Sequence, residues 1–315
     1  MTDILINNAR KKYSTILPQN EQSLVHIRKE RSGDKEILLR TLKEAWQQAT
    51  GRLYKFKIND AQLDAWYLLS HVTGLTRAEF FIKGDELMSE EQERQYEELL
   101  ARRTSHEPLQ YIIGTQEFMS LSFVVRDGVL IPRQETELLV EEALPLSEGK
   151  RVLDMCTGSG CIIVSIAKLA NPEQAVGVDV SEQALAVARE NAARLDVQAS
   201  FIQSNLFEQV EGQFDVIVSN PPYIASNVIP ELMPEVREYE PMLALDGKED
   251  GLFFYRTIIA QAKEYLAEGG TILFEIGYDQ GEAVATLLEQ AGYQDIVVKK
   301  DYAGLDRIVR AVVEK

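Results

Sequence analysis

The chain contains few of the residues that build disulfide-rich or metal-stabilised folds. Its 315 residues include only two cysteines, Cys156 and Cys161, and three histidines. This composition excludes a disulfide framework and gives no zinc-ligand spacing, so no metal site is expected. Long apolar runs are also missing, and residues 1–20 lack the apolar core of a secretory signal. We therefore expect a soluble cytoplasmic protein that does not contact a membrane.

Positive charge is scarce as well. Lys and Arg number 33 against 50 Asp and Glu, which gives a formal net charge of −17. Broad binding to a phosphate backbone needs a basic face, so direct nucleic-acid binding is not expected. The charge balance is compatible with small ligands and with basic proteins as binding partners. The length allows about two domains.

The hydrophobic pattern divides the chain into segments. Residues 1–35 are mildly basic and show no sustained apolar period, which predicts a flexible extension. Residues 36–105 read as a helical domain, with one helix ending near Gly51 and another over 60–73. Its role is either a structural cap or the docking of a macromolecular substrate. Capping boxes are predicted at two helix starts, at Thr76 with Glu79 and at Ser89 with Gln92.

Residues 106–135 are expected to form a linker and a β-hairpin, broken at Arg126-Asp127-Gly128. Residues 136–315 alternate helix and strand, which predicts an α/β fold with a doubly wound parallel sheet. The expected strands are 151–155, 175–180, 199–203, 214–219, 271–276, 295–299 and 307–313. The link 300–306 is too short for a crossover helix, so the last two strands should be antiparallel.

A glycine-rich loop follows the first of these strands. The segment Cys156-Thr157-Gly158-Ser159-Gly160 precedes a helix, and Asp179 ends the next strand, 19 residues after Gly160. Glycines let the backbone approach a ligand closely, and a carboxylate at this place suits ribose hydroxyls.

The ligand of this loop can be narrowed. The dinucleotide-binding fingerprint has a third glycine at the position where this chain has Ile163. This difference makes a ligand with a pyrophosphate group less favoured. A ligand with ribose and adenine but no phosphate, such as S-adenosylmethionine, tolerates that substitution.

A second polar loop follows the strand 214–219. It reads Asn220-Pro221-Pro222-Tyr223. The Asn220 side-chain oxygen and the Pro221 carbonyl can each accept one N–H of a planar NH₂ group, and Tyr223 offers a flat face. The alternative is a rigid turn after a strand, because Asn-Pro turns are common.

Together these motifs resemble the class I methyltransferases, and Asn-Pro-Pro-Tyr resembles their amino-methylating signature. More closely, the chain resembles the bacterial release-factor glutamine N5-methyltransferases, the HemK or PrmC family, over about residues 36–315. The segments that carry the resemblance are 107–114, 117–118, 130–137, 220–223, 240–241, 244–245, 250–252, 274–277, 303–304 and 306–307.

The resemblance implies a seven-stranded class I methyltransferase domain over 136–315 and a substrate-docking role for the helical domain. It implies transfer of a methyl group from S-adenosylmethionine to the glutamine of the Gly-Gly-Gln loop in class 1 peptide-chain release factors. The catalytic residues would be Asn220, Pro221, Pro222 and Tyr223. Phe118 and Arg133 would join them in binding substrate. The cofactor would contact Cys156, Thr157, Gly158, Ser159, Gly160, Asp179, Asn205, Leu206 and Asn220.

The chain departs from the family pattern at four positions. Cys156 stands where the family usually has Gly, and Gln134 where it has Pro. Asn205 replaces a common Asp and Leu206 a common aromatic residue, in the expected adenine pocket.

Three other functions stay open from the sequence. They are a ribosomal-protein glutamine methyltransferase, a DNA or RNA amino-methyltransferase, and a non-catalytic nucleotide-binding module. The charge of −17 disfavours the nucleic-acid enzymes, and an intact Asn220–Tyr223 loop disfavours the binding module.

Overall fold

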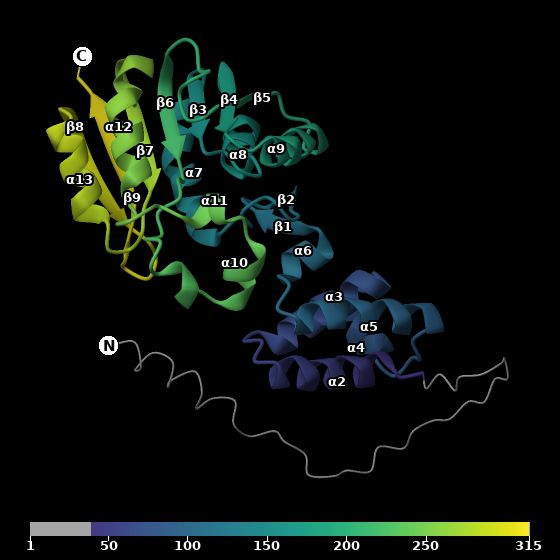
Figure 1. Cartoon of the computed structure of the whole chain (residues 1–315). Helices are drawn as coiled ribbons and strands as arrows, with labels where there is room; N and C mark the ends of the chain where they lie inside the picture. The colour runs from purple at the N-terminus through teal and green to yellow at the C-terminus, as the bar shows by residue number, and fades with distance from the viewer. Residues whose placement is uncertain (1–38, 315) are drawn as a thin grey trace.

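The computed structural model describes residues 39–314, which form a helical domain and a larger α/β domain joined by a short hairpin segment (Figure 1). The predicted extension 1–35 and the first residues of the helical domain lie outside the described residues. Across 39–314, no helix combines the length and apolar character needed to cross a membrane.

The helical domain packs its helices around one apolar core. Its helices are α2 (Leu42–Lys55), α3 (Ala61–Thr73), α4 (Arg77–Lys83) and α5 (Glu90–Thr104). Both predicted capping boxes are confirmed, at the starts of α4 and α5. The predicted stop at Gly51 is wrong: α2 continues to Lys55, because its last turn buries Leu53 in the core that it shares with α3 and α5.

The linker contains a short helix, α6 (Leu109–Ile113), and a hairpin of β1 (Thr115–Phe118) and β2 (Leu121–Val124). The hairpin is present, but its predicted break at Arg126-Asp127-Gly128 is wrong. The strands turn at Met119-Ser120, where φ is 51° and 58°. Two successive positive φ angles are the geometry of a two-residue type I′ turn, whose usual signal is Asn-Gly.

The α/β domain is built on a seven-stranded sheet in the order β5-β4-β3-β6-β7-β9-β8. The strands are β3 (Arg151–Met155), β4 (Gln174–Asp179), β5 (Ser200–Gln203), β6 (Phe214–Ser219), β7 (Leu266–Glu275), β8 (Tyr293–Lys300) and β9 (Asp306–Val313). Strands β3 to β7 run parallel, and β9 pairs antiparallel with both β7 and β8. The predicted antiparallel final pair is thus confirmed.

Helices cover both faces of the sheet, as a doubly wound fold requires (Figure 1). One core lies under α7 (Gln134–Ser147), α8 (Cys161–Ala170) and α9 (Glu182–Arg194). The other lies under α12 (Phe253–Tyr265) and α13 (Gly281–Gln290). The connection from β6 to α12 contains the 3-10 helix η1 (Ile229–Glu231) and the short helices α10 (Pro234–Tyr239) and α11 (Met242–Leu245).

The strand order reverses between β3 and β6. Connections leaving these neighbouring strands go to opposite sides, and the resulting crevice at the carboxyl ends is where open α/β sheets bind ligands. Both sequence motifs lie at this crevice, since the glycine loop follows β3 and Asn220 follows β6.

Candidate functional site

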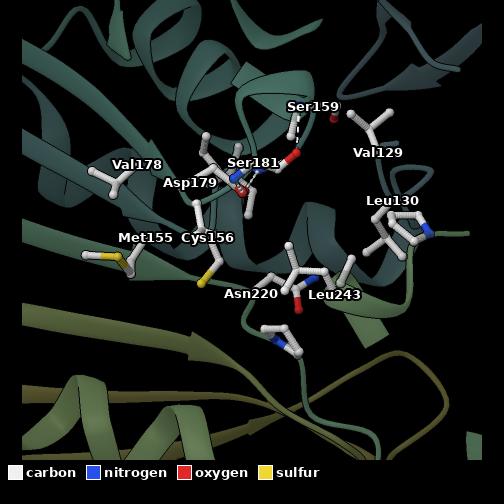
Figure 2. Close-up of a pocket in the computed structure, with 18 of the residues that line it drawn as sticks. Val129, Leu130, Met155, Cys156, Ser159, Val178, Asp179, Ser181, Asn220 and Leu243 are labelled. Atoms are coloured by element: carbon white, nitrogen blue, oxygen red, sulfur yellow. Dashed lines mark hydrogen bonds between the residues drawn. The ribbon is translucent and has the colours of Figure 1, made fainter. Parts of the chain in front are cut away.

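A cavity of about 990 Å³, counted with its part open to solvent, lies at the carboxyl ends of β3, β4, β5 and β6. Figure 2 shows side chains of several of these segments turned toward one space, with Cys156 between Asp179 and Asn220. The predicted site residues that line it are Arg133, Cys156, Thr157, Gly158, Ser159, Asp179, Asn205, Leu206, Asn220 and Pro222. The fold therefore brings together most of the residues selected from the sequence.

The two glycines of the loop after β3 have different roles. Gly158 has φ +54°, and a Cβ built on it would meet no heavy atom within 4 Å, so its backbone faces open space in the cavity. Gly160 has φ +79°, and a Cβ there would lie 2.9 Å from the Cβ of Ala188 in α9. Gly160 does not line the cavity; it permits close packing of α8 on α9.

Asp179 is fixed by the backbone around it. Its Oδ2 accepts a hydrogen bond from the Gly158 N–H at 2.9 Å, and its Oδ1 accepts one from the Ser181 N–H at 2.9 Å. Burial raises the pKa of the carboxyl, and these N–H groups oppose the rise. Each carboxylate oxygen keeps a second lone pair, so the group can still accept hydrogen bonds from ligand hydroxyls.

A further carboxyl, Asp154, lies beneath the loop and was missed from the sequence. It is fully buried in β3 and accepts a hydrogen bond from the Thr157 hydroxyl at 2.5 Å. Burial raises its pKa to about 7. The available signal was an acidic residue inside an apolar strand, which is costly unless it has a role.

Two of the departures from the family pattern have left-handed backbone. Cys156 has φ 64° and Leu206 has φ 50°, a conformation that favours glycine. Burial raises the pKa of the Cys156 thiol, which keeps it protonated and unreactive. Asn205 lines the cavity at an exposed position, and its Nδ2 donates to Glu208 Oε1 at 2.7 Å.

The Asn220–Tyr223 loop is held at several points. Asn220 Nδ2 donates to Thr136 Oγ1 at 3.3 Å, and the Tyr223 hydroxyl donates to Glu275 Oε1 at 3.5 Å. Gln280 Nε2 donates to the Tyr223 carbonyl at 3.0 Å. Burial raises the pKa of Tyr223. Asn220 and Pro222 line the cavity, whereas Pro221 and Tyr223 are not among its lining residues.

Arg133 pairs with a carboxylate that the sequence did not connect to it. Its Nη2 lies 2.5 Å from Oε2 of Glu240, whose side chain is 1% exposed. Burial raises the pKa of Glu240, and the Arg133 guanidinium opposes the rise. The pair ties the start of α7 to the segment that contributes Pro241 and Leu243 to the cavity.

The structure corrects the expectation for Phe118. Its side chain is 1% exposed and packs against Phe123, with ring centroids 5.9 Å apart, in the core beneath α7 and α8. It does not line the cavity. Strand alternation at the end of β1 turns Phe118 inward, and the sequence did not reveal which face of the hairpin was buried.

Comparison with known families matches both domains. Residues 44–114 match the PrmC N-terminal domain, and residues 133–235 match the methyltransferase small domain.

Similar proteins match the chain along most of its length. The release factor glutamine methyltransferase of Geobacter sulfurreducens is 44% identical, over 85% of this chain and 95% of that protein. The one of Clostridium botulinum is 40% identical, over 86% of this chain and 98% of that protein. A crystal structure of protein-(glutamine-N5) methyltransferase (release factor-specific) from Alicyclobacillus acidocaldarius is 33% identical with a TM-score of 0.37, over 61% of this chain and 100% of that chain.

Proposed function

Because this chain belongs to the release factor glutamine methyltransferase family, we propose that it methylates the glutamine of the Gly-Gly-Gln loop in class 1 peptide-chain release factors. It is an S-adenosylmethionine-dependent enzyme that acts on the side-chain amide nitrogen of a protein glutamine. The observation that carries the proposal is the position of Asn220, whose carboxamide lines the same cavity as Gly158 and Asp179.

The cavity residues fit S-adenosylmethionine. Gly158 leaves its backbone open to the cavity, Asp179 keeps acceptor capacity for ribose hydroxyls, and Leu130, Leu206 and Phe254 add apolar surface for an adenine. Bound there, the cofactor supplies an electrophilic methyl group on a positively charged sulfur. The charged groups in the lining are the Asp179 carboxylate, which suits such a cation, and the Arg133 guanidinium, which is paired with Glu240.

The loop after β6 suits the substrate amide. An amide nitrogen is a poor nucleophile, because its lone pair is delocalised into the carbonyl, so the enzyme must act through orientation. We assign the two N–H groups of the substrate amide to the Asn220 side-chain oxygen and the Pro221 carbonyl. These acceptors also favour the positive charge that develops on nitrogen. Tyr223 is assigned to the wall of the substrate site, and Arg133 holds the neighbouring wall through Glu240.

The rest of the chain supports a protein substrate. We assign release-factor docking to the helical domain, which contacts α10 beside the cavity through the Arg103–Glu235 ion pair. The net charge of −17 suits a basic protein partner rather than a nucleic acid. A cytoplasmic location is part of the proposal, because free thiols such as those of Cys156 and Cys161 persist in a reducing compartment.

The function is tested by offering competing substrates. The purified enzyme is incubated with isotope-labelled S-adenosylmethionine and a class 1 release factor, total ribosomal protein or DNA. The methyl group is then located by mass spectrometry. We expect label on the Gly-Gly-Gln glutamine. Label confined to a ribosomal-protein glutamine would support the second glutamine methyltransferase function instead, and label on DNA alone would overturn both.

A further inference from the structure

Glu275 is a buried carboxyl group next to the proposed substrate site. It ends β7, and the β6–β7 ladder pairs Ser219 with Phe274, so Asn220 and Glu275 are the next residues on neighbouring strands. Glu275 is 1% exposed, and its Oε2 has no hydrogen-bond partner within the described residues. Burying a carboxyl group whose oxygens are not all hydrogen-bonded lowers the stability of the fold, which points to a functional reason for keeping it.

The groups around Glu275 come from five elements, one of which is α8, whose buried Cys161 thiol interacts electrostatically with the carboxyl. Thr136 and Glu135 approach from α7, Arg307 from β9, and Asn220 and Tyr223 from the loop after β6, while the Tyr255 hydroxyl of α12 donates to the Glu275 backbone carbonyl. The Tyr223 hydroxyl donates to Oε1 at 3.5 Å. Thr136 and Asn220 are close enough to lower the pKa of Glu275, although neither makes a full hydrogen bond to Oε2.

Hydrogen-bond polarity then determines which way Asn220 faces. Burial raises the pKa of Glu275, while hydrogen bonding from the Thr136 hydroxyl and from the Asn220 amide lowers it. Because an ionised carboxylate only accepts hydrogen bonds, both groups direct a donor toward Glu275, and Thr136 has a single proton to give. The Thr136 oxygen can then only accept, and it accepts from Asn220 Nδ2 at 3.3 Å. The other end of the same carboxamide is Oδ1, which has no donor within residues 39–314 and remains free for a ligand.

We propose that Glu275, acting together with Thr136, is a positioning residue that keeps the Asn220 carboxamide oxygen directed at the substrate. A protonated Glu275 could instead donate to Thr136, which would then donate to Asn220 and allow the carboxamide to turn over. The relay therefore works when Glu275 is ionised. The inference rests on the proposed function, because it explains how the acceptor of the substrate amide is held.

The main test is Thr136→Val, which removes the hydroxyl at nearly constant size. We expect kcat for release-factor methylation to fall about tenfold, with little change in KM or in the Kd of S-adenosylmethionine. Thr136→Ser should restore kcat close to the wild-type value. Thr271→Val is the matched control, because Thr271 is also a buried threonine but lies on β7, away from Asn220, and this variant should leave kcat unchanged.

The pH profile separates positioning from packing. Burial raises the pKa of Glu275 to about 7, so wild-type kcat should rise between about pH 6 and about pH 8 as Glu275 ionises. This rise should be weaker in Thr136→Val and in Glu275→Gln. Asp154 also has a pKa of about 7, but it is unchanged in both variants, so the difference between profiles reports on Glu275.

A substrate-free measurement keeps this inference distinct from the proposed function. The ¹⁵N signal of the Asn220 side-chain NH₂, identified by its loss in Asn220→Asp, should titrate near pH 7 in the wild type and not in Glu275→Gln. Wild-type kcat in Thr136→Val, or an Asn220 signal that does not titrate, would overturn the relay. A wild-type enzyme that fails to methylate release factor while the signal titrates would overturn only the proposed function.

Discussion

At Asn220 a single carboxamide both holds the loop and faces the ligand. Its Nδ2 is bonded to Thr136, and its oxygen is the proposed acceptor of a substrate N–H. We expect Asn220→Ala to lower kcat by on the order of 10²–10³, the scale for removing one preorganised polar contact. The Kd of S-adenosylmethionine should change little, as measured by calorimetry. Near-normal turnover of this variant would remove the acceptor role.

Asp179 lies at the other end of the cavity and is predicted to act on the cofactor alone. We expect Asp179→Ala to weaken S-adenosylmethionine binding by more than about 1 kcal/mol, because a charged hydrogen-bond acceptor is lost. Titration calorimetry measures the change directly. Asp250→Ala is a suitable control, since that carboxylate is exposed and pairs with Arg256. Equal Kd values for the wild type and Asp179→Ala would contradict the ribose assignment.

Glu275 links this site to the stability of the whole protein. Burial raises its pKa from 4.5 to about 7, so the folded state binds the proton more tightly than the unfolded state does. The resulting stabilisation is complete below the unfolded pKa and is lost as pH rises through about 7. A shift of this size in a fully buried group corresponds to about 3 kcal/mol.

Glu275→Gln should remove that loss. Urea unfolding near pH 5 and near pH 8 should therefore show a smaller fall in the free energy of unfolding for Glu275→Gln than for the wild type. An identical fall in both proteins would mean that Glu275 does not titrate in this range. A smaller fall in Glu275→Gln, taken together with the proposed role of Glu275, would mean that the protein is less stable when Glu275 carries the charge that orients Asn220.

Among the elements, the turn from β3 into α8 separates ligand binding from helix packing. Gly158→Ala places a methyl group in open cavity space, so it should weaken S-adenosylmethionine binding about tenfold. Because the backbone there has a positive φ, the same change should lower the free energy of unfolding by about 1 kcal/mol. Gly160→Ala drives a methyl group into Ala188 of α9, so it should cost a further 1–3 kcal/mol or so.

Urea unfolding and calorimetry on this pair of variants check the separation. Gly160→Ala should be the less stable protein, and Gly158→Ala should show the larger loss of affinity relative to its loss of stability. The opposite order would mean that the two glycines have been assigned to the wrong roles.

The elements also show which parts of the fold are readable from sequence. Strands such as β3 and β6 were predicted at their observed bounds, because a short apolar run followed by a turn motif has few alternatives. The hairpin turn was misplaced, since Met119-Ser120 carries no turn composition while Arg126-Asp127-Gly128 does. Gly51 wrongly indicates a helix end, because the tertiary burial of Leu53 has no local signal in the sequence.

The candidate site was readable to the extent that its residues sit in local motifs. The glycine loop, Asp179 and Asn220 each follow a strand, so the fold class alone brings them to one edge of the sheet. Contacts between distant segments were not readable: Arg133 with Glu240, and Thr136 with Asn220, join residues from different elements. Phe118 was assigned to the cavity by resemblance, and only the packing of the hairpin shows that it is buried.

For the molecule as a whole, a partly buried ion pair between Arg103 and Glu235 joins the two domains beside the cavity. Arg103 of α5 bonds to Asp64 of α3 at 2.7 Å and to Glu235 of α10 at 3.0 Å. The Tyr239 hydroxyl, at the end of α10, donates to the Ser105 carbonyl at 2.7 Å. The chain continues from α10 into the cavity wall at Pro241. The position of the helical domain is therefore tied to one side of the site.

This tie predicts a difference between large and small substrates. If the helical domain docks the release factor, Glu235→Gln should raise KM for the intact protein about fivefold, a coupling of ~1 kcal/mol. A short peptide containing Gly-Gly-Gln cannot reach that domain, so its kcat/KM should stay near the wild-type value. Glu238→Gln is the matched control, because this glutamate of α10 is exposed and, within the part of the chain that the structure describes, pairs with Arg237 beside it. A proportional loss on both substrates would show that Glu235 supports the cavity itself and not the docking of a partner.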